Sequence, residues 1–140
     1  MTQEFNFPVH AHIEPSTLCN LRCVSCPNIF LPPERKGVMS LDRFREILDK
    51  MLFLKDISLL GLGEPLINPD LLNMAREARM RGITARTVTN GMLLNKIDLE
   101  SLVGYFDEFV ISFVQTNEQT EKGGFQCINT KKPIIRVNLQ

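Results

Sequence analysis

Apolar residues recur at two different spacings along the chain, and the two spacings alternate. Every-second-residue patterns and short apolar runs predict strands, whereas three-to-four-residue patterns predict helices. We expect strands at residues 8–14, 56–62, 83–89, 108–114 and 133–139. We expect helices at residues 40–54, 68–82 and 99–106. Strands separated by helices favour an α/β fold in which right-handed crossovers build a parallel sheet.

Local signals mark where the predicted helices begin and end. Ser40 and Asn68 are suitable N-caps, and Pro69 suits the first position of the second helix. Gly82 follows a basic last turn and is expected to close that helix. The connection from Gln115 to Lys132 contains a Gly-Gly pair and no helical periodicity. It is therefore barely adequate for a crossover between parallel strands, which usually contains a helix.

The composition is that of an ordinary folded domain. Of the 140 residues, 44% are hydrophobic, which is enough for the core of one domain. The 16 basic residues balance the 16 acidic ones, so net charge favours neither nucleic acid nor an anionic membrane. The N-terminal segment MTQEFNFPVH lacks the pattern of a signal peptide, and no apolar run reaches the roughly 20 residues that span a bilayer. We expect a single cytoplasmic domain, residues 1–140, with reduced cysteines.

Three of the 4 cysteines lie in one short stretch, CNLRCVSC. Cys19, Cys23 and Cys26 have the spacing of one helix face, so packing as small apolar side chains is one interpretation. Metal binding is another, because three thiolates can hold three irons of a cubane cluster and leave the fourth iron open to chemistry. A zinc ion bound by the three cysteines and by His10 or His12 is a further alternative.

The cysteine stretch resembles the signature of a known enzyme family. The segment IEPSTLCNLRCVSCP has CxxxCxxC spacing, and GLGEPL, TNG and VIS follow it in that order along the chain. In these motifs the chain is similar to the radical S-adenosylmethionine (radical SAM) enzymes. It looks most like the branch that modifies peptides and other substrates.

The resemblance implies a fold, two cofactors and a reaction. The fold is an incomplete radical SAM core, a partial parallel (β/α) barrel of the TIM type. Cys19, Cys23 and Cys26 would hold a [4Fe-4S] cluster whose open iron binds S-adenosylmethionine. Reductive cleavage of S-adenosylmethionine then gives a 5′-deoxyadenosyl radical, which takes a hydrogen atom from the substrate. The electron would come from a donor such as a flavodoxin or ferredoxin, and the substrate is unknown.

The resemblance also implies residues that contact S-adenosylmethionine. They are Gly63, Glu64, Thr89, Asn90 and Ser112, and the alternation of the fifth strand adds Arg136 and Asn138 as candidates. Gly63 would let the main chain approach the methionine amine, since glycine has no side chain in the way. Arg136 and Asn138 alternate with apolar residues, so they would face the barrel lumen or, on an uncovered edge strand, water. No catalytic side chain is assigned.

The chain departs from the family pattern in two ways. Ser25 takes a position that usually holds a large apolar residue near the adenine, so weaker cofactor binding is expected. The sequence predicts five strands where the family core has six strand–helix units, which indicates a truncated core without an auxiliary-cluster domain. A non-catalytic iron–sulfur or S-adenosylmethionine-binding module is therefore the alternative to an enzyme. The open strand edge would favour an oligomer or a partner chain that completes the barrel.

Overall fold

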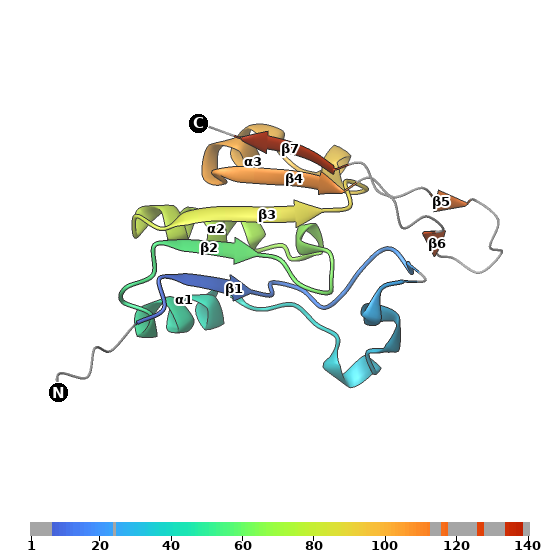
Figure 1. Cartoon of the computed structure of the whole chain (residues 1–140), viewed down its shortest axis with the longest axis horizontal. Helices are drawn as coiled ribbons and strands as arrows, with labels where there is room; N and C mark the ends of the chain where they lie inside the picture. The colour runs from blue at the N-terminus through green and yellow to red at the C-terminus, as the bar shows by residue number, and fades with distance from the viewer. Residues whose placement is uncertain (1–6, 24, 113–115, 118–125, 128–133, 139–140) are drawn as a thin grey trace.

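The predicted strands form one main sheet, and the predicted helices connect successive strands of that sheet along the chain (Figure 1). The structure is a computed structural model that describes residues 7–23, 25–112, 116–117, 126–127 and 134–138. The α-helices are α1 (Leu41–Lys50), α2 (Leu71–Met80) and α3 (Leu99–Tyr105). The strands are β1 (His10–Ile13), β2 (Asp56–Leu59), β3 (Thr84–Thr89), β4 (Glu108–Ser112), β5 (Thr116–Asn117), β6 (Gln126–Cys127) and β7 (Ile134–Asn138). Short 3-10 turns η1 (Pro27–Phe30), η2 (Pro33–Arg35), η3 (Pro65–Ile67) and η4 (Leu94–Lys96) lie between them.

The main sheet has the strand order β1-β2-β3-β4-β7. β1 to β4 are parallel neighbours in register, with His10 opposite Asp56 and Asp56 opposite Thr84. This confirms the predicted α/β class and the partial parallel barrel. The outer ends of the last two predicted strands, residues 113–114, 133 and 139, lie outside the described residues.

The prediction that the fifth strand is parallel is wrong. β7 pairs antiparallel with β4, with Ser112 opposite Ile134 and Glu108 opposite Asn138. In the connection between them, the described residues form only β5 and β6, a short antiparallel pair in a separate sheet. An antiparallel return needs no helical crossover, whereas a parallel strand does. The absence of helical periodicity in this connection was therefore the signal for the strand's direction.

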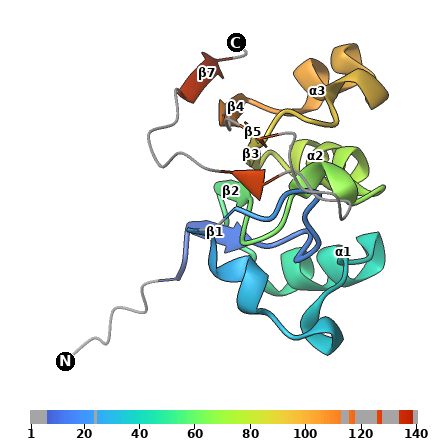
Figure 2. The ribbon, with the colours of Figure 1, turned by 90° about the vertical axis from the view of Figure 1, so that its right-hand side faces the viewer.

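Helices α1, α2 and α3 all lie against one face of the main sheet, as Figure 2 shows. The buried core lies between them and the sheet, with Phe44 and Leu48 of α1 packed in the same cluster as Ile57 and Leu59 of β2. In β1 the residues at every second position, Ala11 and Ile13, are buried, as the sequence predicts for a strand with one covered face. Among the described residues, no helix is long and apolar enough to cross a membrane.

The helix ends follow the sequence signals at two sites and differ at a third. The Ser40 hydroxyl accepts a hydrogen bond from the Arg43 N–H, as predicted for an N-cap. Gly82 follows α2 with a φ of 73°, the left-handed conformation that glycine tolerates best. However, α2 begins after Asp70, two residues later than predicted, and the Asn68 side-chain oxygen accepts a hydrogen bond from the Asp70 N–H at 2.8 Å. The Asn68 amide donates to the carbonyls of Pro15 and Met39, at 2.7 and 2.9 Å, and thereby joins three segments of the chain.

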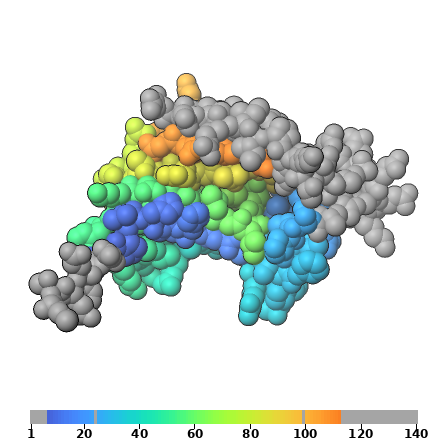
Figure 3. All heavy atoms as spheres, viewed as in Figure 1, coloured from blue at the N-terminus to red at the C-terminus, as the bar shows by residue number. Residues whose placement is uncertain are grey.

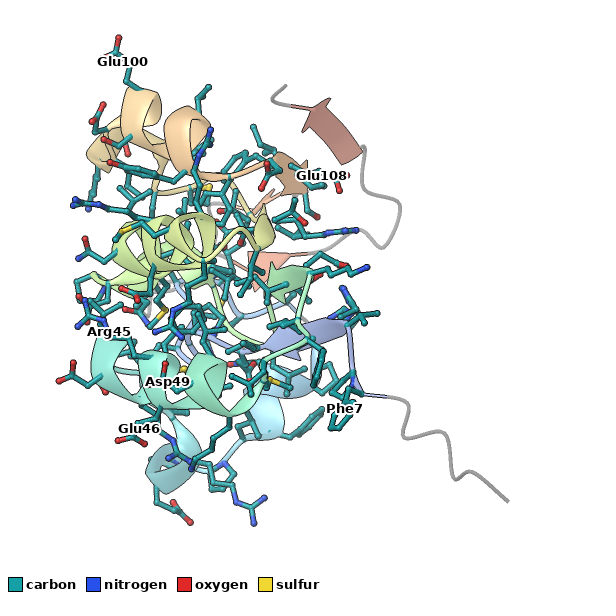
Figure 4. The ribbon with its side chains drawn as sticks, turned by 90° about the vertical axis from the view of Figure 1, so that its left-hand side faces the viewer. Phe7, Arg45, Glu46, Asp49, Glu100 and Glu108 are labelled. Carbon is teal, nitrogen blue, oxygen red and sulfur yellow. The ribbon has the colours of Figure 1, made fainter. Side chains whose placement is uncertain are left out.

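The opposite face of the sheet carries no helix among the described residues, and β1 to β4 are visible on it as successive bands (Figure 3). Four charged or titratable side chains cross this face near the amino ends of the strands, and we call them the polar ladder: His10, Asp56, Arg86 and Glu108. His10 Nδ1 contacts the Asp56 carboxylate. Arg86 lies 3.2 Å from Asp56 and 3.9 Å from Glu108. Figure 4, viewed from this end, shows Glu108 on the side of the sheet away from the helices.

Candidate functional site

The cysteine loop follows β1 and lies beyond the carboxyl ends of the parallel strands (Figure 1). Cys23 is buried, Cys19 and Cys26 are half-buried, and the three pack together with buried Leu21. None of the described residues between Cys19 and Cys26 is helical. The interpretation of the three cysteines as one face of a helix is therefore wrong, and the loop instead gathers three thiols at one end of the sheet.

Each end of the cysteine loop contacts a segment that follows another strand. Near Cys19, the Leu21 N–H donates to the Cys19 sulfur at 3.4 Å, and the Asn90 side-chain amide approaches it at 4.0 Å. At the other end, the Cys26 thiol points toward the Leu62 carbonyl at 4.0 Å. Because Leu62 follows β2 and Asn90 follows β3, the loop spans the ends of these two strands. This is the edge of a parallel sheet where α/β folds place their ligands.

The Cys19 thiol lies in a setting that disfavours an isolated thiolate. Burial raises the pKa of Cys19 above its ordinary value of 9.0, and the nearby charges of Glu64 and Cys26 add to the effect. Hydrogen bonds from Leu21 and Asn90 act in the opposite direction. A coordinating metal removes the proton from a thiol outright, so this pKa describes the metal-free site alone.

The set of donors fits an iron–sulfur cluster better than a single ion. In the described part of the chain, no three His, Cys, Asp or Glu side chains converge where one metal ion could be held. A cubane needs no such convergence, because each of three thiolates binds a different iron. His10, a candidate fourth ligand for zinc, contacts Asp56 in the polar ladder, and both residues begin their strands at the opposite end of the sheet. The cysteine loop therefore has the donors for a three-thiolate cluster.

The GLGEPL segment forms a tight loop after β2. The Leu62 N–H donates to the Glu14 carboxylate, and the Gly63 N–H lies 3.4 Å from the same oxygen. A Cβ atom on Gly63 would lie 2.1 Å from the Ser16 carbonyl oxygen and 2.6 Å from that of Leu18. Glycine is thus required here because the chain's own backbone passes close by. The sequence anticipated a close approach at Gly63 but assigned it to the cofactor.

Glu64 is the centre of a buried hydrogen-bond network. Glu64 is buried, with 2% of its surface exposed. One carboxylate oxygen accepts from Leu66 N–H at 3.1 Å and from the Thr89 hydroxyl at 2.6 Å. The other accepts from Asn90 N–H at 2.8 Å. Burial raises the pKa of Glu64 above its ordinary value of 4.5, and the bonds from Asn90, Thr89 and Leu66 oppose that shift. The network joins the end of β3 to the segment after β2.

The remaining predicted site residues come from β4 and β7. Ser112 ends β4 and is half-buried, and the neighbouring Ile111 pairs with Thr89 of β3. Ser112 therefore lies at the same end of the sheet as Asn90. In β7, Arg136 is paired with Val110 and Asn138 with Glu108. The side chains of Arg136 and Asn138 lie outside the part of the structure that is described. The structure thus brings together the cysteines, Gly63, Glu64, Thr89 and Asn90.

Two residues at this end of the sheet were missed by sequence reasoning. Glu14 binds the loop after β2, and Asn20 accepts a hydrogen bond from Asn90 at 2.8 Å. Glu14 lies on the same side of its strand as His10 and His12 in the alternating pattern, and this was the available signal. Nothing in the local sequence connects Asn20 with Asn90, because the two are 70 residues apart along the chain.

Comparison with known proteins identifies the family to which this arrangement belongs. Residues 13–134 match the family model of the Radical SAM superfamily. The chain belongs to that superfamily. The match covers the cysteine loop and the segments after β2 and β3. Radical SAM proteins use a [4Fe-4S] cluster and S-adenosylmethionine, and the resemblance seen in the sequence motifs is thereby confirmed.

The relatives differ in what they act on. The chain is 38% identical over 96 residues to a tungsten-containing aldehyde ferredoxin oxidoreductase cofactor-modifying protein of Pyrococcus furiosus, a match that covers 66% of the chain and 27% of the relative. It is 29% identical over 112 residues to the antilisterial bacteriocin subtilosin biosynthesis protein AlbA of Bacillus subtilis, covering 79% and 25%. The chain thus spans about a quarter of the length of these radical SAM relatives.

A solved structure has the same fold. The crystal structure of BtrN in complex with AdoMet and 2-DOIA superposes with a TM-score of 0.63 and 24% sequence identity. The superposition covers 76% of this chain and 46% of BtrN. At this level of identity the likeness concerns the fold alone, and it agrees with a partial radical SAM barrel.

Proposed function

We propose that this chain is the core domain of a radical SAM enzyme in which Cys19, Cys23 and Cys26 hold a [4Fe-4S] cluster. The observation that carries the proposal is the packing of these three cysteines in one non-helical loop beyond the carboxyl ends of β1 to β3. When bound, the cluster and S-adenosylmethionine supply the chemistry, reductive formation of a 5′-deoxyadenosyl radical that takes a hydrogen atom from the substrate.

The protein's own residues hold the loops around the cluster in fixed positions. Glu14 binds the main chain after β2, where Leu62 approaches Cys26. Glu64 ties the end of β3 to the same segment through buried bonds. We assign Gly63, Glu64 and Thr89 to this support, since their close approaches and hydrogen bonds are made within the protein. The Asn90 side chain is likewise bonded within the protein, to Asn20 and Met92. Contacts to S-adenosylmethionine are therefore assigned to the neighbouring main chain and Ser112, with Arg136 and Asn138 as further candidates from β7.

A non-catalytic iron–sulfur or S-adenosylmethionine-binding module is the second candidate. It is favoured by the antiparallel direction of β7, which leaves four parallel strands in the described sheet. It is also favoured by Ser25, which is exposed in the cysteine loop and offers no apolar surface to an adenine. Both functions require the cluster and differ in whether S-adenosylmethionine is cleaved.

The substrate and the partner proteins can be proposed only by chemical class. One relative is named for modifying the cofactor of a tungsten-containing oxidoreductase and another for bacteriocin biosynthesis. Because the 5′-deoxyadenosyl radical takes a hydrogen atom, we propose a substrate that offers a carbon-bound hydrogen to it. The reaction needs a one-electron donor such as a flavodoxin or ferredoxin, and a reducing, cytoplasmic setting suits the three thiols. The edge of β7 and the helix-free face of the sheet are proposed to be completed by further protein, as an oligomer or a partner chain.

The decisive experiment is anaerobic reconstitution with iron and sulfide. The wild-type chain should bind about four irons, as a cubane requires. Cys19→Ala, Cys23→Ala and Cys26→Ala should each lose stable cluster binding, whereas the control Cys127→Ala should retain it. Full iron loading in Cys23→Ala would contradict the assignment. With a strong reductant and S-adenosylmethionine, release of 5′-deoxyadenosine supports the enzyme, and its absence from a fully loaded protein supports the non-catalytic module.

A further inference from the structure

We infer that Asn20 and Asn90 are a positioning pair that fixes the Cys19 end of the cysteine loop and directs an amide N–H toward the Cys19 sulfur. Asn90 Nδ2 donates to Asn20 Oδ1 at 2.8 Å and lies 4.0 Å from Cys19 Sγ. The inference rests on the proposed function, since it takes Cys19 to be a cluster ligand.

The orientation of the Asn90 amide is set by its other bonds. Its oxygen accepts a hydrogen bond from the Met92 N–H at 3.0 Å, so its nitrogen is the atom that faces the cysteine loop. Its backbone N–H donates to the buried Glu64 carboxylate at 2.8 Å. Hydrogen bonds therefore fix both the backbone N–H and the side-chain oxygen of Asn90, in addition to its bond with Asn20. Because the Asn90 side chain has little conformational freedom, its bond to Asn20 holds the cysteine loop in a fixed position relative to the end of β3.

The pair should affect the cluster in two separable ways. The bond from Asn90 to Asn20 links the loop to the end of β3 and keeps Cys19 in place for iron. Outer-shell bonds of this kind typically contribute about 10–100-fold to metal affinity. The amide N–H near the sulfur presents the positive end of a dipole, which favours the more negative, reduced cluster and raises its reduction potential. At 4.0 Å this second effect is weaker than that of a short N–H···S bond.

Three variants separate these effects. Asn90→Ala and Asn20→Ala both remove the link. Asn20→Ala leaves the Asn90 N–H near Cys19, whereas Asn90→Ala removes it, so the difference between these two variants isolates the N–H. Asn90→Asp has nearly the same shape and keeps an acceptor for Met92, but it replaces the N–H with a negative charge. Asn73→Ala is the matched control, because Asn73 is exposed on α2 and its amide lies 3.5 Å from Asp70.

The measurements are iron loss to a chelator and the midpoint potential from a reductive titration followed by electron paramagnetic resonance, both without S-adenosylmethionine. Asn90→Ala and Asn20→Ala should lose iron about tenfold faster than wild type. Asn90→Ala should have a more negative midpoint potential than Asn20→Ala, Asn90→Asp the most negative of the three, and Asn73→Ala should match wild type in both measurements. If both alanine variants retained iron and had the same midpoint potential as wild type, the inference that Asn20 and Asn90 position Cys19 would be wrong. Failure of the wild-type chain to assemble a cluster would overturn the proposed function as well.

Discussion

The two ends of the sheet hold their carboxylates in opposite ways. At the carboxyl end, Glu64 is 2% exposed and its oxygens accept three hydrogen bonds from two different segments. At the amino end, the side chain of Asp56 is 28% exposed and shares the polar ladder with His10 and Arg86. Both carboxylates lie beside the same strands, yet one is sealed between loops and the other faces the helix-free side of the sheet.

This difference between the two ends of the sheet indicates where the fold tolerates few amino-acid substitutions. A buried polar network is costly to break, because each donor left without an acceptor loses its hydration as well. Ion pairs that water can reach are worth little, since solvent screens the charges and replaces the lost partner. We therefore expect the carboxyl end, where the cysteine loop lies, to be rigid, and the polar ladder to accept substitution.

The largest expected effect comes from Gly63→Ala. The added Cβ would lie 2.1 Å from the Ser16 carbonyl oxygen, a backbone atom that no side-chain rotation can move. Overpacking typically costs about 1–3 kcal/mol, and we expect a loss near 3 kcal/mol in the free energy of unfolding. Gly37→Ala is the matched control, since a Cβ there meets nothing within 4 Å, and urea denaturation should show equal midpoints for it and wild type. Equal midpoints for Gly63→Ala would contradict the close approach.

Glu64→Gln should have the next largest effect. The amide oxygen can still accept from Leu66 and Thr89, but its NH₂ group then faces the Asn90 N–H, and two donors oppose each other. One buried unsatisfied donor costs about 1–3 kcal/mol, so we expect a loss of about 2 kcal/mol at pH 5 by urea denaturation. A variant as stable as wild type at that pH would show that the network contributes no stability.

The same pair of proteins tests the raised pKa of Glu64. A carboxyl group whose pKa is higher in the folded state contributes stability that is fully present below its unfolded pKa, near 4.5, and is lost as the pH rises through the folded pKa. The amide of the Glu64→Gln variant does not titrate, so the stability advantage of wild type over this variant should shrink as the pH rises from 4.5 toward 8. An advantage that grows over this range would mean that hydrogen bonding outweighs burial and lowers the pKa.

Asp56→Asn should have the smallest effect of the three substitutions. It weakens the contacts of Asp56 with His10 and Arg86, which are 38% and 45% exposed. Exposed ion pairs contribute about 0–1 kcal/mol, so the urea midpoint should change little. A loss as large as that of Glu64→Gln would remove the distinction between the two ends of the sheet. It would also indicate that the polar ladder is shielded from water.

The amino-acid sequence alone predicts most of the secondary structure and the chemistry of the site. Strand and helix patterns are local, so the positions of β1 to β4 and of the three helices follow from periodicity and from caps such as Ser40. The three cysteines are also a local feature, and their types and spacing indicate an iron–sulfur cluster before any fold is known. Asn68 shows the limit, because no local pattern predicts that its amide also donates to the carbonyls of Pro15 and Met39.

Tertiary structure alone decided what each polar residue near the site contacts. No local pattern separates Glu64, which is sealed by bonds from Thr89 and Asn90, from a residue open to a cofactor. The pairing of Asn90 with Asn20 depends likewise on segments that are distant along the chain, whereas the direction of β7 had a signal in the non-helical connection before it. Residue type fixes which atoms can donate, accept or bind metal, whereas burial and partners depend on which loops the sheet brings together.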